Sequence, residues 1–418
     1  MMLGVPPDAR PQPSDRPPAT CDAVVVGAGI LGLATARELL LRAPGTAVVV
    51  LEQDAVIARR QTGHNSGVIH SGLAYAPGSL KARLCVDGAR RMYALCAELG
   101  VPALRCGKLV LARTEAELPR LAELERRAGL NAVRILHLEG DAITAVEPHA
   151  RGIAALHSPD TGVVDFARVA AALRADVEHR GGRVVTGCAV TRIDPRPGGA
   201  VVRHAAGETR AARAVACAGA GSDRLARAGG GAADPRIVPF RGAYFRLRRP
   251  ELVRALIYPV PDPALPFLGV HLTRRIQGDV LAGPTALPVA ARDAQHRSTV
   301  RARDVVDTLT WPGTYRMAWR WRRQALREAG YALSAAAYAR EAATLVPELR
   351  RADLVPAFAG VRAQALGRDG ALVDDFVFEQ TPGVVHVRNA PSPAATSALA
   401  IAAEIADRAQ RTARRSRP

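Results

Sequence analysis

The sequence predicts an α/β (α+β) fold, in which a Rossmann-like nucleotide-binding domain built from discontinuous segments carries an inserted substrate domain of antiparallel sheet and helices. Three observations support this fold. A βαβ pattern with a glycine-rich turn occupies residues 22–52, short alternating apolar runs occupy 237–283, and strand and helix patterns return at 370–408. Because the α/β signal stands at both ends of the chain, the two ends are expected to form one domain around the insertion.

The βαβ unit is the most regular part of the pattern. Ala23–Val26 is an all-apolar run, typical of a parallel strand that is buried on both faces. It leads into the turn Gly27-Ala28-Gly29-Ile30-Leu31-Gly32 and a helix to about Leu41. A second apolar strand, Ala47–Leu51, ends at Glu52.

Periodicity predicts further elements along the rest of the chain. Helices are expected at 80–100, 115–128, 166–180, largely throughout 302–346, and from about Ala394. Strands are expected at 104–112, 183–190, 199–204, 213–217, 242–247, 267–275, 279–282, 372–373 and 384–387.

These elements divide the chain into two domains and a leader. The nucleotide-binding domain is expected to comprise 21–100, 150–235 and 355–418, and the substrate domain 101–149 and 236–354. Residues 1–20 hold prolines and charges without an apolar core, so a disordered leader is expected there.

Composition excludes several functional classes. The chain of 418 residues has a net charge of +18, but its basic residues are spread along the sequence without a nucleic-acid-binding motif, so no nucleic-acid partner is expected. Six scattered cysteines form no CxxC pair and no metal-ligand spacing, which predicts reduced thiols in a cytoplasmic protein without a bound metal. No run of about 18 apolar residues would make a transmembrane helix.

The glycine-rich turn has the context of a dinucleotide site. Gly27 permits the tight turn, Gly29 lets a pyrophosphate approach, and Gly32 lets helix and strand pack closely. Glu52 stands where an acid binds the ribose hydroxyls, and its charge would repel the 2′-phosphate of NADP. FAD is favoured over NAD, because a Gly/Ser/His-rich stretch at 59–75 could wrap a flavin and no second complete fingerprint follows.

Several motifs then carry a resemblance. They are Thr62-Gly63-His64-Asn65-Ser66-Gly67-Val68-Ile69-His70-Ser71-Gly72, Pro77–Ala82, Cys106-Gly107-Lys108-Leu109, Pro239–Gly242, Tyr258–Pro261, His271–Arg274, Gly283-Pro284 and Asn389–Thr396. Across roughly 22–405, the chain resembles the L-2-hydroxyglutarate dehydrogenase/oxidase family, of the D-amino-acid-oxidase-like flavoproteins. The resemblance implies noncovalent FAD and the oxidation of L-2-hydroxyglutarate to 2-oxoglutarate, with oxygen or a quinone as the electron acceptor.

The resemblance also implies which residues hold the FAD. Besides the glycine turn and Glu52, the expected contacts are Thr62, His64, Ser66, Gly67, Val190, Gly219, Ala394, Ala395 and Thr396. Val190 would close the 183–190 strand and offer backbone atoms to the adenine. The helix from about Ala394 would direct its N–H groups at the flavin, which favours the anionic reduced form. Three positions depart from the family pattern: Ala243 stands for an acid, Thr285 for an asparagine and Ala74 for a tyrosine.

The oxidation of a 2-hydroxy acid needs a base for the hydroxyl proton, and a neutral imidazole suits that task. Of ten histidines, His70 and His271 are the candidates. His70 alternatively contacts the flavin or makes structural hydrogen bonds, and His271 alternatively is a satisfied sheet histidine. A dicarboxylate also needs cationic anchors: Arg362 is expected in the catalytic site, and Arg241 and Lys81 are expected to bind substrate. Tyr258 is a further expected substrate-binding residue. The alternative for each cation is a surface salt bridge.

A basic amphipathic helix is predicted at 314–329. Arg316, Arg320, Arg323 and Arg327 would form one stripe, opposite Ala318, Trp321, Ala325 and Ala329. It is either an ordinary surface helix or a peripheral contact with the inner face of the cell membrane, which would suit a quinone acceptor. Two rival functions remain: a sibling flavoprotein acting on another 2-hydroxy acid or an amine, and a non-enzymatic, basic, surface-binding flavoprotein.

Overall fold

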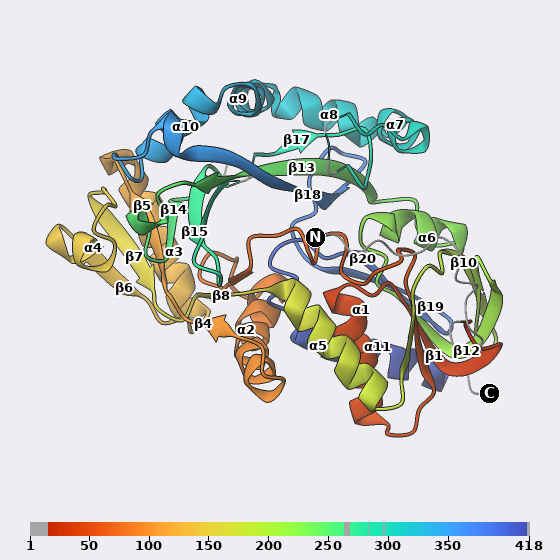
Figure 1. The fold of residues 1–418 in the computed structure, drawn as a ribbon. Helices are drawn as coiled ribbons and strands as arrows, with labels where there is room; N and C mark the ends of the chain where they lie inside the picture. Colours follow the sequence, from red (N-terminus) through yellow and green to blue (C-terminus); the bar gives the residue numbers. More distant parts are fainter. Residues whose placement is uncertain (1–15, 263–267, 284, 295, 297, 416–418) are drawn as a thin grey trace, which may run out of the picture.

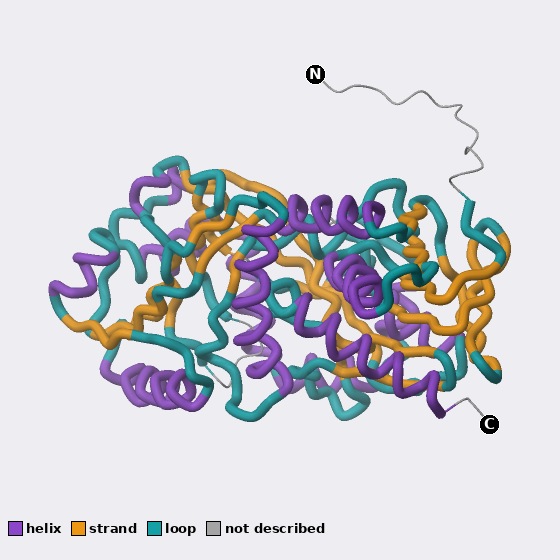
Figure 2. Tube along the Cα trace, turned by 90° about the horizontal axis from the view of Figure 1, so that it is seen from below, coloured by secondary structure: helices purple, strands orange, loops and turns teal. Residues whose placement is uncertain are grey.

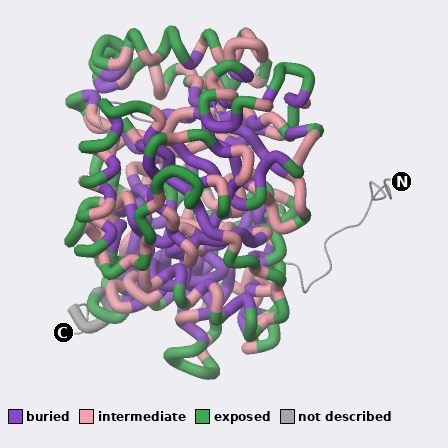
Figure 3. The backbone as a smooth tube through the Cα atoms, turned by 90° about the vertical axis from the view of Figure 1, so that its left-hand side faces the viewer, coloured by how far each residue is buried: buried purple, intermediate pink, exposed green. Residues whose placement is uncertain are grey.

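The fold is that of a computed structural model, which describes residues 16–262, 268–283, 285–294, 296 and 298–415. Figure 1 shows two parts that lie next to each other. One is built on the strands β13, β14 and β15, and the other on β1, β12 and β20. Buried backbone runs through the middle of both parts, and exposed segments form their outside (Figure 3). This is the two-part organisation that the sequence predicts.

The first sheet has a parallel centre. Its strand order is β10-β11-β12-β1-β2-β9, with β20 beside β12 and β19 beside β20, and the β12-β1-β2-β9 and β12-β20 pairs are parallel. The bounds are β1 Thr20–Val26, β2 Val48–Leu51, β9 Arg183–Val185, β10 Val190–Arg196, β11 Gly199–His204, β12 Gly207–Ala216, β19 Val377–Thr381 and β20 Val384–Asn389. The centre is parallel because the apolar β1 and β2 are buried on both faces.

Helices cover both faces of this sheet. The largest core cluster packs α1 (Ile30–Arg42) between α5 (Phe166–His179) and α11 (Ala398–Arg415), with α2 (Leu80–Glu98) beside α11. Figure 2 shows helices packed next to the strands in this part of the molecule. On the other face, α6 (Ser222–Ala228) contributes Leu225 to a smaller cluster. The nucleotide-binding layer predicted from the first 52 residues therefore has a core on each side.

The second sheet is mostly antiparallel, in the order β17-β13-β16-β15-β14-β5-β7-β6, with β18 beside β13. Its strands are β5 Lys108–Ala112, β6 Leu136–Glu139, β7 Ala154–Ser158, β13 Arg236–Leu247, β14 Leu256–Pro259, β15 His271–Arg274, β16 Val280–Gly283, β17 Leu287–Pro288 and β18 Leu354–Leu366. Its helices are α3 Leu118–Leu130, α4 Asp141–Val146, α7 Ala302–Leu309, α8 Pro312–Arg320, α9 Arg322–Leu333 and α10 Ala335–Ala343. A small sheet of β3 (Val68–Ile69), β8 (Gly162–Val164) and β4 (Ala103–Leu104) lies between the two parts.

Two predicted domain boundaries must move. The boundaries at 150 and 355 place β7 and β18 in the nucleotide-binding domain, but β7 pairs with β5 and β6, and β18 pairs with β13, in the second sheet. The β5 partner of β7 and the β13 partner of β18 are distant in sequence, so local periodicity carries no sign of these pairings. The predicted leader lies mostly outside the described residues, and Thr20 already belongs to β1.

Other predicted element ends are also wrong. Val190 begins β10 and does not close the preceding strand, because β9 ends at Val185. The C-terminal helix begins at Ala398, after a turn in which the Ala394 N–H donates to the Pro391 carbonyl at 2.9 Å. The strand predicted at 372–373 is a single bridge from Leu366 to Leu372.

The predicted helix at 314–329 is two helices. Trp321 leaves helical geometry between α8 and α9, and it packs with Met317 against the buried Trp311. The expected apolar face is therefore wrong, since Ala318 and Ala325 are exposed. The packing of Met317 and Trp321 against Trp311 overrides the simple helical period.

A buried ion pair attaches α6 to the segment before α7. Arg292 is 5% exposed, and its Nη2 donates to the Asp223 carboxylate at 3.0 Å. We expect Arg292→Met to lower the free energy of unfolding by about 3–5 kcal/mol, because it leaves the Asp223 charge buried without its main partner. The matched exposed pair is Arg90–Asp87, where Arg90→Met should cost about 1 kcal/mol or less. Denaturant unfolding measures both, and equal losses would contradict the assignment.

Candidate functional site

A cavity of about 1070 Å³ extends from the glycine-rich turn to the second sheet. Segments distant in the sequence line it: the turn after β1, the loop after β2, the turn after β12, strand β18, and the turn before α11. Its volume is at the upper end of the range for cofactor and ligand pockets. The positions of the predicted cofactor-binding and substrate-binding residues can therefore be examined relative to this one cavity.

The glycine turn has room for a phosphate at one position only. A Cβ on Gly32 would lie 1.8 Å from the Gly27 carbonyl oxygen, and one on Gly27, where φ is +100°, would lie 2.5 Å from that of Cys217. The Cβ of a residue at Gly29 would meet only the Thr62 hydroxyl, at 3.3 Å. Since α1 begins directly after Gly29, its dipole and the first-turn N–H groups that follow Ile30 are available to an anion.

Glu52 organises the same turn. It is buried, and its two carboxylate oxygens accept hydrogen bonds from the N–H groups of Ala28 (2.6 Å) and Asp54 (2.9 Å). Each oxygen keeps a second lone pair, and the residue lines the cavity, so it can also accept from ribose hydroxyls. The pyrophosphate-sized opening beside an acid fits the ADP part of FAD.

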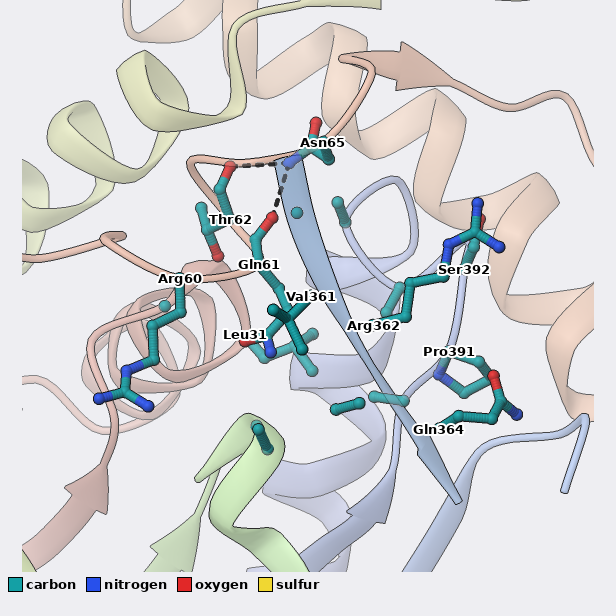
Figure 4. A pocket seen from close by; sticks show the side chains of 18 of the residues that line it. Leu31, Arg60, Gln61, Thr62, Asn65, Val361, Arg362, Gln364, Pro391 and Ser392 are labelled. Carbon is teal, nitrogen blue, oxygen red and sulfur yellow. Dashed lines mark hydrogen bonds between the residues drawn. The ribbon is translucent and has the colours of Figure 1, made fainter. Parts of the chain in front are cut away.

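The loop after β2 is held by an asparagine that the motif analysis does not single out. Asn65 donates from Nδ2 to the carbonyls of Gln61 (3.0 Å) and Thr62 (2.7 Å), and its Oδ1 accepts from Gly67 N–H (2.8 Å) (Figure 4). Thr62 Oγ1 accepts from Ile30 N–H at 3.0 Å, which fixes the loop to α1. The signal for Asn65 is its type, because asparagine side chains commonly close such turns on the backbone.

Of the other predicted flavin residues, all but Gly67 line the cavity. Ser66 lines it, and a Cβ at Gly67, where φ is +77°, would lie 2.5 Å from the Val164 carbonyl oxygen. His64 lines it too, with Nδ1 3.1 Å from the Arg60 carbonyl. The remaining predicted contacts that line the cavity are Val190, Gly219, Ala394, Ala395 and Thr396.

Thr396 joins the turn before α11 to the stretch 59–75 after β2, which we call the flavin loop. Its hydroxyl accepts from the His70 N–H at 3.1 Å and donates to the Val68 carbonyl at 3.1 Å. A side chain near the C-terminus thus fixes the loop that carries His70. This tertiary link, and not a helix start at Ala394, places the predicted turn beside the flavin loop.

Two neutral histidines face the same end of the cavity. His271, on β15, is 6% exposed, and its Nδ1 lies 2.9 Å from the Gly269 carbonyl. Its ring stacks on Tyr258 at 4.3 Å between centroids. Burial, with a smaller contribution from the nearby Arg362 and Lys108 cations, lowers its pKa to about 4. Burial and the Lys108, His271 and Lys81 charges lower the pKa of His70 to about 3.

Cations surround these histidines. Figure 4 shows Arg362 on β18 directed toward the turn that carries Pro391 and Ser392. Lys81, on α2, lies over the Tyr75 ring, and its Nζ contacts Asp374 at 2.7 Å. The expected alternative for Lys81, a salt bridge, is therefore present at the edge of the cavity.

Lys108 is a cation that the sequence interpretation passed over. It begins β5, is 6% exposed, and holds Nζ 5.2 Å from the Tyr258 ring centroid. Among the described residues, no carboxylate lies within 4.0 Å of that Nζ. Burial lowers its pKa to about 8. Its only sequence signal is its place in the Cys106–Leu109 motif.

One predicted substrate residue lies elsewhere. Arg241 is on β13, opposite Val361, but it is not among the cavity-lining residues. Two of the three departures from the family pattern, Ala243 and Thr285, also lie outside the cavity lining. These two residues contact each other. The third, Ala74, lines the cavity.

Comparisons with known proteins show the family of the chain. The family described as FAD dependent oxidoreductase matches residues 22–408. The chain is 43% identical to the mitochondrial L-2-hydroxyglutarate dehydrogenase of Nematostella vectensis, over 93% of this chain and 90% of that one. The corresponding values are 42%, 93% and 88% for the human mitochondrial enzyme of that name, and 39%, 93% and 93% for the L-2-hydroxyglutarate dehydrogenase of Escherichia coli.

Solved structures show the same fold. The FAD-bound L-alpha-glycerophosphate oxidase of Mycoplasma pneumoniae superposes with a TM-score of 0.76 at 22% identity, covering 94% of this chain and 95% of that one. Glycine oxidase from Geobacillus kaustophilus gives 0.70 at 19% identity, with the same coverage of 94% and 95%. The cofactor of the protein is FAD. The chain belongs to the FAD dependent oxidoreductase family and, within it, to the L-2-hydroxyglutarate dehydrogenases.

Proposed function

We propose that this protein oxidises L-2-hydroxyglutarate to 2-oxoglutarate. The observation that carries the proposal is the buried Lys108 ammonium, which faces two neutral histidines and has no carboxylate partner among the described residues. A buried cation without a counter-ion is unfavourable, so a substrate carboxylate placed beside it stabilises the site. The relatives reported above carry the name of this dicarboxylate substrate.

His271 is the residue best placed to take the hydroxyl proton. A carbonyl oxygen can only accept, so the contact with Gly269 puts the ring hydrogen on Nδ1 and leaves the Nε2 lone pair available. Stacking on Tyr258 holds the ring in position. Bound FAD supplies the acceptor for the hydride that leaves C2. His70, neutral and in the same cavity, then hydrogen-bonds the substrate.

Arg362 and Lys108 serve as the anchors for the two carboxylates. The Arg362 guanidinium can hold one carboxylate through two parallel hydrogen bonds. Lys108 binds the C5 carboxylate as a point charge, from the opposite part of the second sheet, since β5 and β18 are far apart in the strand order. Lys81 is already paired with Asp374, so it closes the cavity edge and contributes less to substrate charge.

Substrate identity can be tested by anaerobic photometry. The yellow holoprotein should bleach on addition of L-2-hydroxyglutarate and stay yellow with the D-isomer, L-lactate or glycine. Bleaching by the D-isomer or by amino acids alone would overturn the substrate, and no bleaching by any compound would favour the non-enzymatic alternative. Reoxidation of the bleached protein by air or by a soluble quinone then separates the two acceptors that the sequence leaves open.

The base is tested by substitution together with pH. His271→Asn should lower kcat by about 10²- to 10⁴-fold, the usual contribution of general base catalysis. In the unsubstituted enzyme, kcat/KM should hold steady from neutral pH downward and fall as pH drops through about 4, where His271 becomes protonated. His70→Asn serves as the matched variant. If His70→Asn shows the loss of kcat expected for His271→Asn, and His271→Asn keeps its activity, then His70 is the base.

The Lys108 anchor predicts a difference between substrates. Lys108→Met should raise KM for L-2-hydroxyglutarate by about 10- to 100-fold, the value of a hydrogen bond to a charged group, and leave L-2-hydroxypentanoate nearly unaffected, because that substrate lacks the second carboxylate. Since the pKa of Lys108 is lowered to about 8, kcat/KM should fall as pH rises through 8. In Lys108→Arg that fall should move to higher pH. Equal effects on both substrates would contradict the role.

A further inference from the structure

Three buried hydroxyl groups from three separate segments contact one another. The Oγ atoms of Ser71 and Ser158 lie 2.8 Å apart, and Thr161 Oγ1 lies 3.2 Å from the first and 3.0 Å from the second. Ser71 is 7% exposed, and Ser158 and Thr161 are fully buried. A hydroxyl has one hydrogen and two lone pairs, so each of the three can donate once and accept once within the group. We call these three residues the hydroxyl triangle.

The triangle connects the flavin loop to the second sheet. Ser71 follows His70 in the flavin loop, Ser158 is the last residue of β7, and Thr161 stands directly before β8. Ser158 is opposite Lys108 in the antiparallel pair of β5 and β7, so these two side chains point to the same face of the sheet (Figure 1). None of the three hydroxyl residues lines the cavity, whereas His70 and Lys108 do. The triangle can therefore act on a substrate only through such neighbours.

The turn before Lys108 is also attached to the triangle. The Gly107 N–H donates to the Thr161 carbonyl at 2.9 Å. Gly107 has a φ of +82°, and a Cβ there would lie 2.6 Å from the Nε2 atom of His157, so the turn has little room to move. The backbone of Lys108 is thus held on two sides, by Thr161 through Gly107 and by Ser158 across the sheet.

The Lys108 ammonium follows its backbone because the side chain is enclosed. The residue is 6% exposed, and its Nζ lies 5.2 Å from the Tyr258 ring centroid. Burial, and after it the Lys108 charge, lowers the pKa of His70 to about 3, which places the two groups close together in the cavity. The triangle joins the two segments that set the separation between them.

We propose that the hydroxyl triangle is a positioning element that selects the chain length of the dicarboxylate. The inference rests on the proposed function, in which His70 hydrogen-bonds the substrate and Lys108 binds its C5 carboxylate. The separation of these two groups sets how many carbon atoms fit between them. A rigid separation suits one chain length and accommodates a shorter or longer acid poorly. Without the triangle the separation varies, and the discrimination between chain lengths falls.

Calorimetry with succinate, glutarate and adipate tests the proposal without turnover. These dicarboxylates differ in chain length and lack the hydroxyl, so the oxidised holoprotein binds them without oxidising them. The unsubstituted protein should bind glutarate about tenfold or more tightly than either of the others. Thr161→Val keeps the shape of the side chain and removes its hydrogen bonds, so it should reduce that preference to about threefold or less. Thr161→Ser, which restores the hydroxyl, should recover the preference.

Two further measurements separate positioning from a general loss of structure. Ser71→Ala removes a different member of the triangle and should reduce the glutarate preference as well, which provides a second variant. In turnover, both variants should raise KM for L-2-hydroxyglutarate more than they lower kcat, because the hydride acceptor stays in place. FAD absorbance of the purified variants checks that the cofactor is retained.

Thr209→Val is the matched control. Thr209 lies on β12, is fully buried, and donates from its hydroxyl to the Pro18 carbonyl at 2.7 Å. It does not line the cavity. The same change at this position also removes a buried hydrogen bond, so it should lower the denaturant midpoint to a similar extent as Thr161→Val and leave the glutarate preference unchanged.

Three results would overturn the proposal. They are the absence of a glutarate preference in the unsubstituted protein, an unchanged preference in Thr161→Val and Ser71→Ala, and an equal loss of preference in Thr209→Val. Failure of the proposed function is distinguishable from these results, because L-2-hydroxyglutarate would then not bleach the unsubstituted holoprotein.

Discussion

The close backbone contact between the turns after β1 and β12 determines where the cofactor cavity lies. At Gly27, any side chain would meet the Cys217 carbonyl, so the two turns can touch only if that position is glycine. Gly32 then brings the start of α1 down onto the same turn. Two segments far apart in sequence thereby form one edge, at the carboxyl ends of parallel strands, where nucleotide sites form in such sheets.

The cofactor end of the cavity could be predicted because its signals are local. Glycine spacing, an apolar strand before it and an acid after the next strand are all read within 22–52, and the structure confirms that βαβ unit. The hydrogen bonds that hold the flavin loop are different. Thr396 bonds to His70 and Val68, which are more than 300 residues away in the sequence. No local sequence pattern predicts a contact between such distant residues.

The substrate end could be predicted only in part. His70, His271, Lys81, Tyr258 and Arg362 do line one cavity, whereas Arg241 does not. Lys108 could not be found from its type, because lysine is usually solvated and only burial makes its charge consequential. The boundaries at β7 and β18 failed for a related reason, since a strand that pairs with distant partners looks like any other strand.

Two of the three departures from the family pattern, Ala243 and Thr285, contact each other in this fold. Thr285 Oγ1 accepts from the Ala243 N–H at 3.2 Å, and its own N–H donates to the Ala243 carbonyl at 3.2 Å. The pair lies where the register of β13 shifts against β18, so the hydroxyl satisfies a donor that the irregular strand leaves without a ladder partner. Ala243 itself does not line the cavity, but its two neighbours in the chain, Gly242 and Tyr244, do. The pair can therefore affect the shape of the cavity wall through those neighbours, whereas Lys108 and Arg362, the anchors that we propose for a dicarboxylate, line the cavity themselves.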